Sequence, residues 1–137
     1  MGNTLYTKIS FQDVSFAIEN QSSFILINTL PITQQHCLIK NTIPSSSEET
    51  IVNHYLTSNK NINIIVYGKN SIDNDIEKKC NQLIQLGFKN VYGYTGGLYQ
   101  WLLHQDIYGE ENFPTTSKCD DMLLYKEPNH FQNYLLT

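Results

Sequence analysis

The sequence contains no arginine, and all nine of its basic residues are lysines. Arginine carries a planar guanidinium that grips phosphate, sulfate or thiosulfate through two parallel hydrogen bonds, which the ammonium group of lysine does not reproduce. Any mechanism that depends on an arginine clamp within this chain is therefore excluded. The net charge is −4 at pH 7, so the chain also lacks the basic surplus of nucleic-acid-binding domains. We expect no nucleic-acid partner.

Long apolar runs are absent as well. No run reaches the roughly 18 residues that a membrane-spanning helix requires. The first residues, Met1 to Lys8, are polar and lack the apolar stretch of a secretory signal. From these two features we expect an intracellular, cytoplasmic protein without a membrane partner. The 137 residues, of which 40% are hydrophobic, suffice for a single domain with its own core.

Cysteine is scarce, with three residues at positions 37, 80 and 119. Because the number is odd and the spacing is wide, we expect no disulfide framework in an intracellular chain. No CxxC or HxxxH pair offers two metal ligands at a useful spacing, and the four histidines are scattered. We therefore expect no metal site and no cofactor.

The apolar residues that are present predict alternating strands and helices. Short continuous runs at 24–27, 62–67 and 88–94 are typical of buried parallel strands. Capping-box patterns predict three helix starts, and they pair Ser10 with Asp13, Ser46 with Glu49, and Asn74 with Glu77. This alternation indicates an α/β fold, with a mostly parallel central sheet covered by helices on both faces.

Glycine and proline residues mark predicted helix ends, turns and extended segments in the second half of the chain. Gly87 is the expected stop of the third helix, and Gly96-Gly97 predicts a tight turn before a fourth helix. Phe113 to Thr116 is expected to be an extended, packed segment, and residues 118–125 a short helix. In parallel sheets, ligands bind at the carboxyl ends of strands, which directs attention to the loop after Tyr67.

Four segments, in order, resemble the rhodanese-like domain family. They are Phe24–Asn28, Leu38–Pro44, Ile64–Gly68, and Leu86–Tyr92 followed by Gly96-Gly97 and Trp101. The fourth is the most specific, because Leu-Gly-Phe-x-Asn-Val-Tyr precedes Gly-Gly-x-x-x-Trp. The resemblance implies a rhodanese-like three-layer α/β/α domain spanning residues 1–137. Its core would cover about residues 8–108, and residues 109–137 would form a C-terminal extension.

The departures from the family pattern concern the loop after the third segment. The resemblance implies that an active member begins this loop with a cysteine, which carries sulfane sulfur as a persulfide, and ends it with an arginine. Here Gly68 stands at the cysteine position and Asp73 at about the arginine position. Asn28 and Leu30 also depart from the family's Asp-x-Arg. We therefore interpret the chain as a sulfurtransferase homologue that is a pseudoenzyme rather than an enzyme.

The residues equivalent to the active-site loop are Gly68, Lys69, Asn70, Ser71, Ile72 and Asp73. Two interpretations of this loop remain open. In one, Lys69 and Ser71 hold a small anion together with the loop N–H groups. In the other, the loop only closes the turn between a strand and a helix.

Two hypotheses for the function follow. The first is a non-catalytic domain that acts as a protein-binding or regulatory module, with an unknown protein partner. The second is a sulfurtransferase or thiol-redox enzyme that uses a displaced cysteine, either Cys37 or Cys80. Cys80 falls on an apolar helical stripe, which favours core packing, and Cys37 lies beside His36 in an irregular segment. Phosphatases of this fold need the same loop cysteine and arginine, so that activity is excluded.

Overall fold

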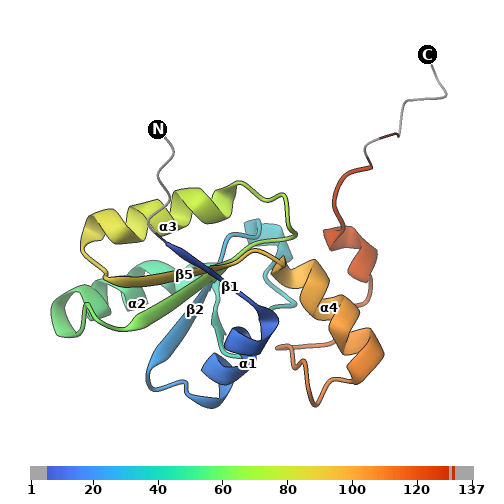
Figure 1. The fold of residues 1–137 in the computed structure, drawn as a ribbon, viewed down its shortest axis with the longest axis horizontal. Coiled ribbons are helices and arrows are strands. Elements are labelled where there is room, and N and C mark those ends of the chain that lie inside the picture. Colours follow the sequence, from blue (N-terminus) through green and yellow to red (C-terminus); the bar gives the residue numbers. More distant parts are fainter. Residues whose placement is uncertain (1–5, 130, 132–137) are drawn as a thin grey trace.

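A parallel sheet forms the centre of the computed structural model, which describes residues 6–129 and 131. Within these residues five strands run in the order β1-β5-β4-β2-β3, and every neighbouring pair is parallel (Figure 1). The strands are β1 (Thr7–Ile9), β2 (Phe24–Asn28), β3 (Thr42–Ile43), β4 (Asn63–Tyr67) and β5 (Asn90–Tyr94). Residues 1–5, on which the expected location partly rests, lie outside the described residues, as do 130 and 132–137 of the expected extension.

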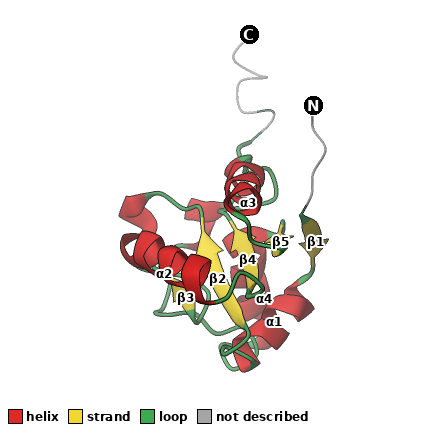
Figure 2. Ribbon diagram, turned by 90° about the vertical axis from the view of Figure 1, so that its left-hand side faces the viewer, coloured by secondary structure: helices red, strands yellow, loops and turns green. Residues whose placement is uncertain are grey.

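Helices cover both faces of the sheet, which confirms the predicted three-layer α/β/α architecture (Figure 2). Helices α1 (Phe11–Glu19) and α4 (Gly97–Tyr108) pack on one face, and α2 (Ser45–Ser58) and α3 (Asp75–Leu86) pack on the other. Side chains alternate between the faces along each strand, so Leu26 lies in the core with α4 while Ile25 lies in the core with α3. Burial on both faces explains why the strands are continuous apolar runs. No described helix is long and apolar enough to cross a lipid bilayer.

Of the three predicted capping boxes, one is present in the structure. Ser10 and Asp13 form the predicted capping box of α1. The box predicted at Ser46 is wrong, because α2 begins at Ser45, whose N–H donates to the side-chain oxygen of Gln35 at 2.9 Å. Asn74 precedes α3 but makes no side-chain cap. In both cases a residue outside the expected box supplies the acceptor.

The C-terminal segment packs against the domain. We call residues 113–129 the strap. Its beginning pairs antiparallel with the segment before β3, through Lys40 N–H to Pro114 O at 3.1 Å and Thr116 N–H to Leu38 O at 2.7 Å. Phe113 and Tyr125 are buried in the same core as α1 and α4. The predicted packed segment at 113–116 is thus confirmed, while the short helix is a 3-10 turn, η2 (Met122–Tyr125), beside α4 (Figure 1).

Candidate functional site

The loop of residues 68–73 joins the carboxyl end of β4 to the start of α3, as the sequence predicted. It also lies against the first turn of α4, where Leu98 N–H donates to Gly68 O at 2.9 Å and Tyr99 N–H donates to Lys69 O at 3.0 Å. Gly97 permits this approach. Its φ is 75°, and a Cβ there would lie 2.8 Å from Asn70 N and 3.0 Å from Gly68 O. Gly97 therefore serves a close backbone contact, in addition to the predicted turn.

The side chain of Asp73 folds back under its own loop. One carboxylate oxygen accepts hydrogen bonds from Thr29 Oγ1 at 3.1 Å and from Lys69 N–H at 3.0 Å. The other accepts from the N–H of Asp75, the first residue of α3, at 2.9 Å. Asp73 thus caps the helix and places a negative charge at its N-terminus, which the helix dipole favours.

The Asp73 carboxylate occupies the space beside Gly68. A Cβ built on Gly68 would lie 2.7 Å from Asp73 Cγ and 2.7 Å from Thr29 Oγ1, and closer still to the Asp73 Oδ2 atom. These separations are shorter than any normal van der Waals contact. A side chain at the position where the resemblance places a cysteine would therefore require the Asp73 and Thr29 side chains to move, and the neighbouring negative charge belongs to the chain itself.

The strap supplies partners for the middle of the loop. The Asn70 amide donates to Tyr125 O at 3.0 Å and to Lys126 O at 3.2 Å. The Ser71 hydroxyl donates to the Glu127 carboxylate at 2.6 Å, and the Ser71 N–H donates to the same oxygen at 3.4 Å. The hydrogen bond from the Ser71 side chain is the main reason why the pKa of Glu127 lies below its ordinary value. The Ser71 hydroxyl and the Lys69 and Ser71 N–H groups, considered for a small anion, thus bind the chain's own carboxylates.

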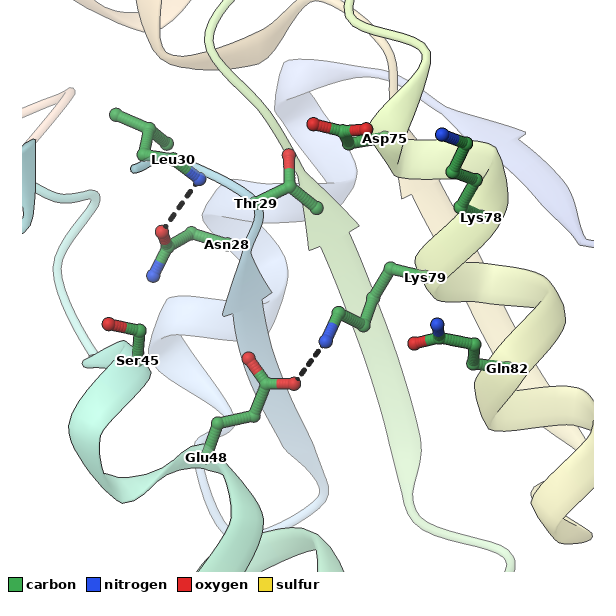
Figure 3. Close-up of a pocket in the computed structure, with 9 residues that line it drawn as sticks. All are labelled: Asn28, Thr29, Leu30, Ser45, Glu48, Asp75, Lys78, Lys79 and Gln82. Atoms are coloured by element: carbon green, nitrogen blue, oxygen red, sulfur yellow. Dashed lines mark hydrogen bonds and ion pairs between the residues drawn. The ribbon is translucent and has the colours of Figure 1, made fainter. Parts of the chain in front are cut away.

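Two hollows flank the loop and meet at Thr29 and Asp75. One has a volume of about 390 Å³ and reaches from Lys69 and Asp73 to Pro128 of the strap. The other, of about 320 Å³, lies between the end of β2, the first turn of α2, and α3 (Figure 3). In this second hollow the ammonium of Lys79 pairs with Glu48. Volumes of this size can accommodate a small ligand.

Asn28, which departs from the family's aspartate, has a structural role at the edge of the second hollow. Its side-chain oxygen accepts from Leu30 N–H at 3.0 Å and from the Gln35 amide at 2.8 Å. Its nitrogen donates to Ile43 O at 3.2 Å and to the Gln35 oxygen at 3.1 Å. The amide thus fastens the end of β2 to β3 and to Gln35, which in turn caps α2.

The structure places Cys80 in the core shared by α2 and α3. Burial, with a smaller contribution from the charge of Glu77, raises the pKa of the Cys80 thiol to about 12. A thiol with such a pKa is protonated at neutral pH and is a poor nucleophile. The Cys80 thiol, one of the two candidate displaced cysteines, therefore does not supply the reactive thiolate that sulfur transfer requires.

The other two cysteines form a disulfide between Cys37 and Cys119, whose Cα atoms lie 5.6 Å apart. The expectation of no disulfide is therefore wrong for this pair. The two residues are 82 positions apart, and the antiparallel contact between the strap and residues 38–40 brings them together. Cys37 is buried and His36 is exposed, so these sequence neighbours lie in different environments. Within the described residues, no group of three or more His, Cys, Asp or Glu side chains is placed to hold a metal ion.

Comparisons with solved structures agree with this architecture. The Alr3790 protein from Anabaena sp. superposes with a TM-score of 0.58 at 22% identity, over 93% of this chain and 91% of that one. Ygr203w from Saccharomyces cerevisiae, described as a homologue of single-domain rhodanese and the Cdc25 phosphatase catalytic domain, gives 0.63 at 14% identity, over 87% and 92%. A thiosulfate sulfurtransferase from Pseudomonas aeruginosa gives 0.57 at 15% identity, over 72% of this chain and 19% of that one. At these identities the similarities establish the fold.

The sequence comparisons identify the family. No curated protein sequence matches this chain. The family model described as the rhodanese-like domain matches residues 28–104, which is more than half of the chain. This range begins at the last residue of β2 and contains the loop after β4 and the start of α4. The chain therefore belongs to the rhodanese-like domain family.

Proposed function

We propose that this chain is a non-catalytic rhodanese-like domain that acts as a protein-binding or regulatory module. The observation that carries the proposal is the Asp73 carboxylate, which fills the space where a side chain of residue 68 would lie. The loop after β4 thus holds its own anion where the resemblance places a persulfide. Family membership alone does not decide activity, because function depends on the site and not on the fold.

Sulfur transfer needs a nucleophile that first takes sulfur from a donor such as thiosulfate. Gly68 offers no nucleophile, and the chain holds no arginine to bind an anionic donor. The hollow beside the loop is lined by Asp73 and Asp75 together with a single lysine, Lys69. Its carboxylates repel thiosulfate at close range. The missing nucleophile and the negative charge beside the loop therefore both support a site that does not catalyse sulfur transfer.

The alternative function is a sulfurtransferase or thiol-redox enzyme that uses a displaced cysteine. The high pKa of Cys80 argues against that residue. The Cys37–Cys119 pair favours the thiol-redox form of the alternative, because Cys119 is partly exposed. The two functions differ in a simple way, since only the second requires a covalent sulfur intermediate or turnover of a thiol substrate.

The proposal extends to location and partners. It includes an intracellular location and a protein partner, with no nucleic-acid or membrane partner. The net charge of −4 supports the exclusion of nucleic acid. Residues 1–137 act in this proposal as one rhodanese-like domain with a C-terminal extension. The described part of that extension, which includes the strap, contacts the loop through Asn70 and Ser71.

The proposal is tested by loading with sulfur. The purified protein is incubated with thiosulfate, once with its disulfide intact and once after reduction and removal of the reductant, and its intact mass is measured. We expect no gain of a sulfur atom in either form, and no thiocyanate above background when cyanide is added. An active thiosulfate sulfurtransferase serves as the positive control.

A stoichiometric gain of one sulfur atom would reject the non-catalytic assignment. Variants then locate the sulfur. An adduct that persists in Cys80→Ala and disappears in Cys119→Ser would establish the strap cysteine as a displaced nucleophile. An adduct lost only in Cys80→Ala would assign the activity to the buried thiol instead.

A further inference from the structure

The Cys37–Cys119 disulfide closes the end of a short pairing between the strap and the body of the domain. Several hydrogen bonds accompany it, among them one from Leu38 N–H to Thr116 Oγ1 at 3.1 Å. Lys40 N–H donates to Pro114 O at 3.1 Å, Thr116 N–H donates to Leu38 O at 2.7 Å, and the Ser117 hydroxyl donates to His36 O at 2.5 Å. The disulfide therefore adds a covalent bond to a strap that is otherwise held by hydrogen bonds, including those from Trp101 and Gln105 of α4, and by the buried side chains of Phe113 and Tyr125.

The two sulfurs differ in access. Cys37 has no exposed surface, and its Sγ lies 3.8 Å from Ser117 O. Cys119 is partly exposed and lines a hollow of about 270 Å³ together with Lys118, Met122 and residues of α4. Of the two residues, Cys119 is therefore the one open to a thiol from solution, whereas Cys37 is covered.

We propose that the Cys37–Cys119 disulfide is a reversible redox lock on the strap, operated at Cys119 by exchange with low-molecular-weight thiols and disulfides of the glutathione type. Disulfides of proteins in reducing compartments are characteristically redox-sensing or catalytic. The lock rests on the intracellular location included in the proposed function, but it does not depend on whether the loop binds a partner or transfers sulfur.

Reduction of the disulfide proceeds through two successive thiol–disulfide exchange reactions. A thiolate attacks Cys119 Sγ, the Cys37–Cys119 bond breaks, and its electron pair leaves on Cys37 Sγ, which takes a proton from water. A second thiolate then attacks the sulfur of the small molecule in the mixed disulfide and releases Cys119 as a thiolate. Two thiols are oxidised to one small disulfide while the protein disulfide is reduced to two thiols. The reverse sequence closes the lock.

The structure favours the closed state of the lock. Opening leaves the Cys37 thiol buried beside Cys119, so the mixed disulfide forms next to the thiol that can displace the small molecule and re-form the bond. When the lock is closed, separation of the strap that begins at its C-terminal side stops at Cys119. When it is open, separation continues through Thr116 and Pro114 and exposes the segment that contains Lys40. The amides of Lys40 and Thr116 therefore report on the lock.

Hydrogen exchange in the oxidised and the reduced protein tests the proposal. After equilibration with excess reduced glutathione, we expect the amides of Lys40 and Thr116 to exchange on the order of tenfold faster relative to Ile65 in β4. The amide of Leu124, which lies beyond the lock, should change less. The melting temperature should fall by about 10 °C on reduction.

Two variants serve as controls. Cys119→Ser, at a partly exposed position, should resemble the reduced protein and should not respond to glutathione. Cys80→Ala keeps both lock cysteines and should respond as the unmodified protein does. The lock is rejected if native protein treated with glutathione disulfide keeps Cys37 and Cys119 as free thiols. It is also rejected if the disulfide opens only after unfolding, or if exchange at Lys40 and Thr116 is the same in both states.

Discussion

At the scale of single residues, Gly68 and Asp73 act as one unit. Glycine at position 68 leaves the space that the Asp73 carboxylate fills, and that carboxylate then binds Thr29, the Lys69 N–H and the Asp75 N–H. Neither residue is explained without the other. A cysteine restored at position 68 would meet both a steric overlap and a negative charge, which would raise the pKa of its thiol.

A double-mutant cycle tests this coupling. Gly68→Ala should destabilise the protein by about 1–3 kcal/mol through overlap with Asp73, and Asp73→Ala should cost about 1–3 kcal/mol because three donors lose their acceptor. In the double variant the overlap with Asp73 is gone and only the overlap with Thr29 Oγ1 remains, so its cost should fall short of the sum by about 1 kcal/mol or more. Urea unfolding of the four proteins measures the coupling, and additive costs would show that the two groups do not meet.

At the scale of elements, the approach of α4 to the loop after β4 determines the shape of the site. Both Leu98 and Tyr99 donate backbone hydrogen bonds to loop carbonyls, so the first turn of α4 is satisfied by the loop rather than by a side-chain cap. Gly97 makes this arrangement possible, because any side chain there would meet the backbone of Asn70 and Gly68.

Substitution of Gly97 should therefore be more damaging than substitution of another glycine with positive φ. Gly87, the C-cap of α3, has a φ of 114°, and a Cβ there would find its nearest neighbour, the flexible Lys60 side chain, at 3.5 Å. Gly87→Ala should cost about 1–2 kcal/mol of backbone strain. Gly97→Ala should cost about 1–3 kcal/mol more, because the obstructing atoms are backbone. Thermal unfolding of both variants checks this, and equal losses would contradict the close contact.

At the scale of the whole molecule, the strap ties the end of the described chain to the centre of the fold. It is held by Phe113 in the core, by the disulfide at Cys119, by Tyr125, and by Glu127 at the loop. In the chain-entropy view, a cross-link across 82 residues stabilises the folded state by about 4 kcal/mol. The strap thus contributes both to stability and to the surface presented beside the loop.

The contact between Glu127 and Ser71 should weaken in acid. The pKa of Glu127 is lowered in the folded protein, so its contribution is present above the ordinary value of 4.5 and is lost as the pH falls through the folded-state value. In an NMR titration, the Ser71 amide should shift with a midpoint below 4.5. Glu127→Gln should remove this titration of the Ser71 amide, whereas Glu111→Gln, at an exposed position, should not. Identical titrations of Ser71 in all three proteins would refute the contact.

Local chemistry accounts for what was predicted correctly. The Ser10–Asp13 capping box, the Gly87 stop of α3 and the buried apolar strands each depend on residues close together in the sequence. The start of α2 was misjudged because its acceptor is Gln35, ten residues upstream across an irregular segment. The edge strand β1 was missed because it is three residues long and is defined by its pairing with β5.

The sequence by itself determined which chemistry is impossible, because the absence of arginine and of a cysteine at position 68 does not depend on conformation. It also determined the α/β architecture, since apolar period and capping are local properties. Only the tertiary structure decided what occupies the site. The Asp73 carboxylate beside Gly68, the Glu127 contact with Ser71 and the Cys37–Cys119 bond all depend on backbone paths that bring separate segments together. The spacing of residues along a chain does not specify those paths.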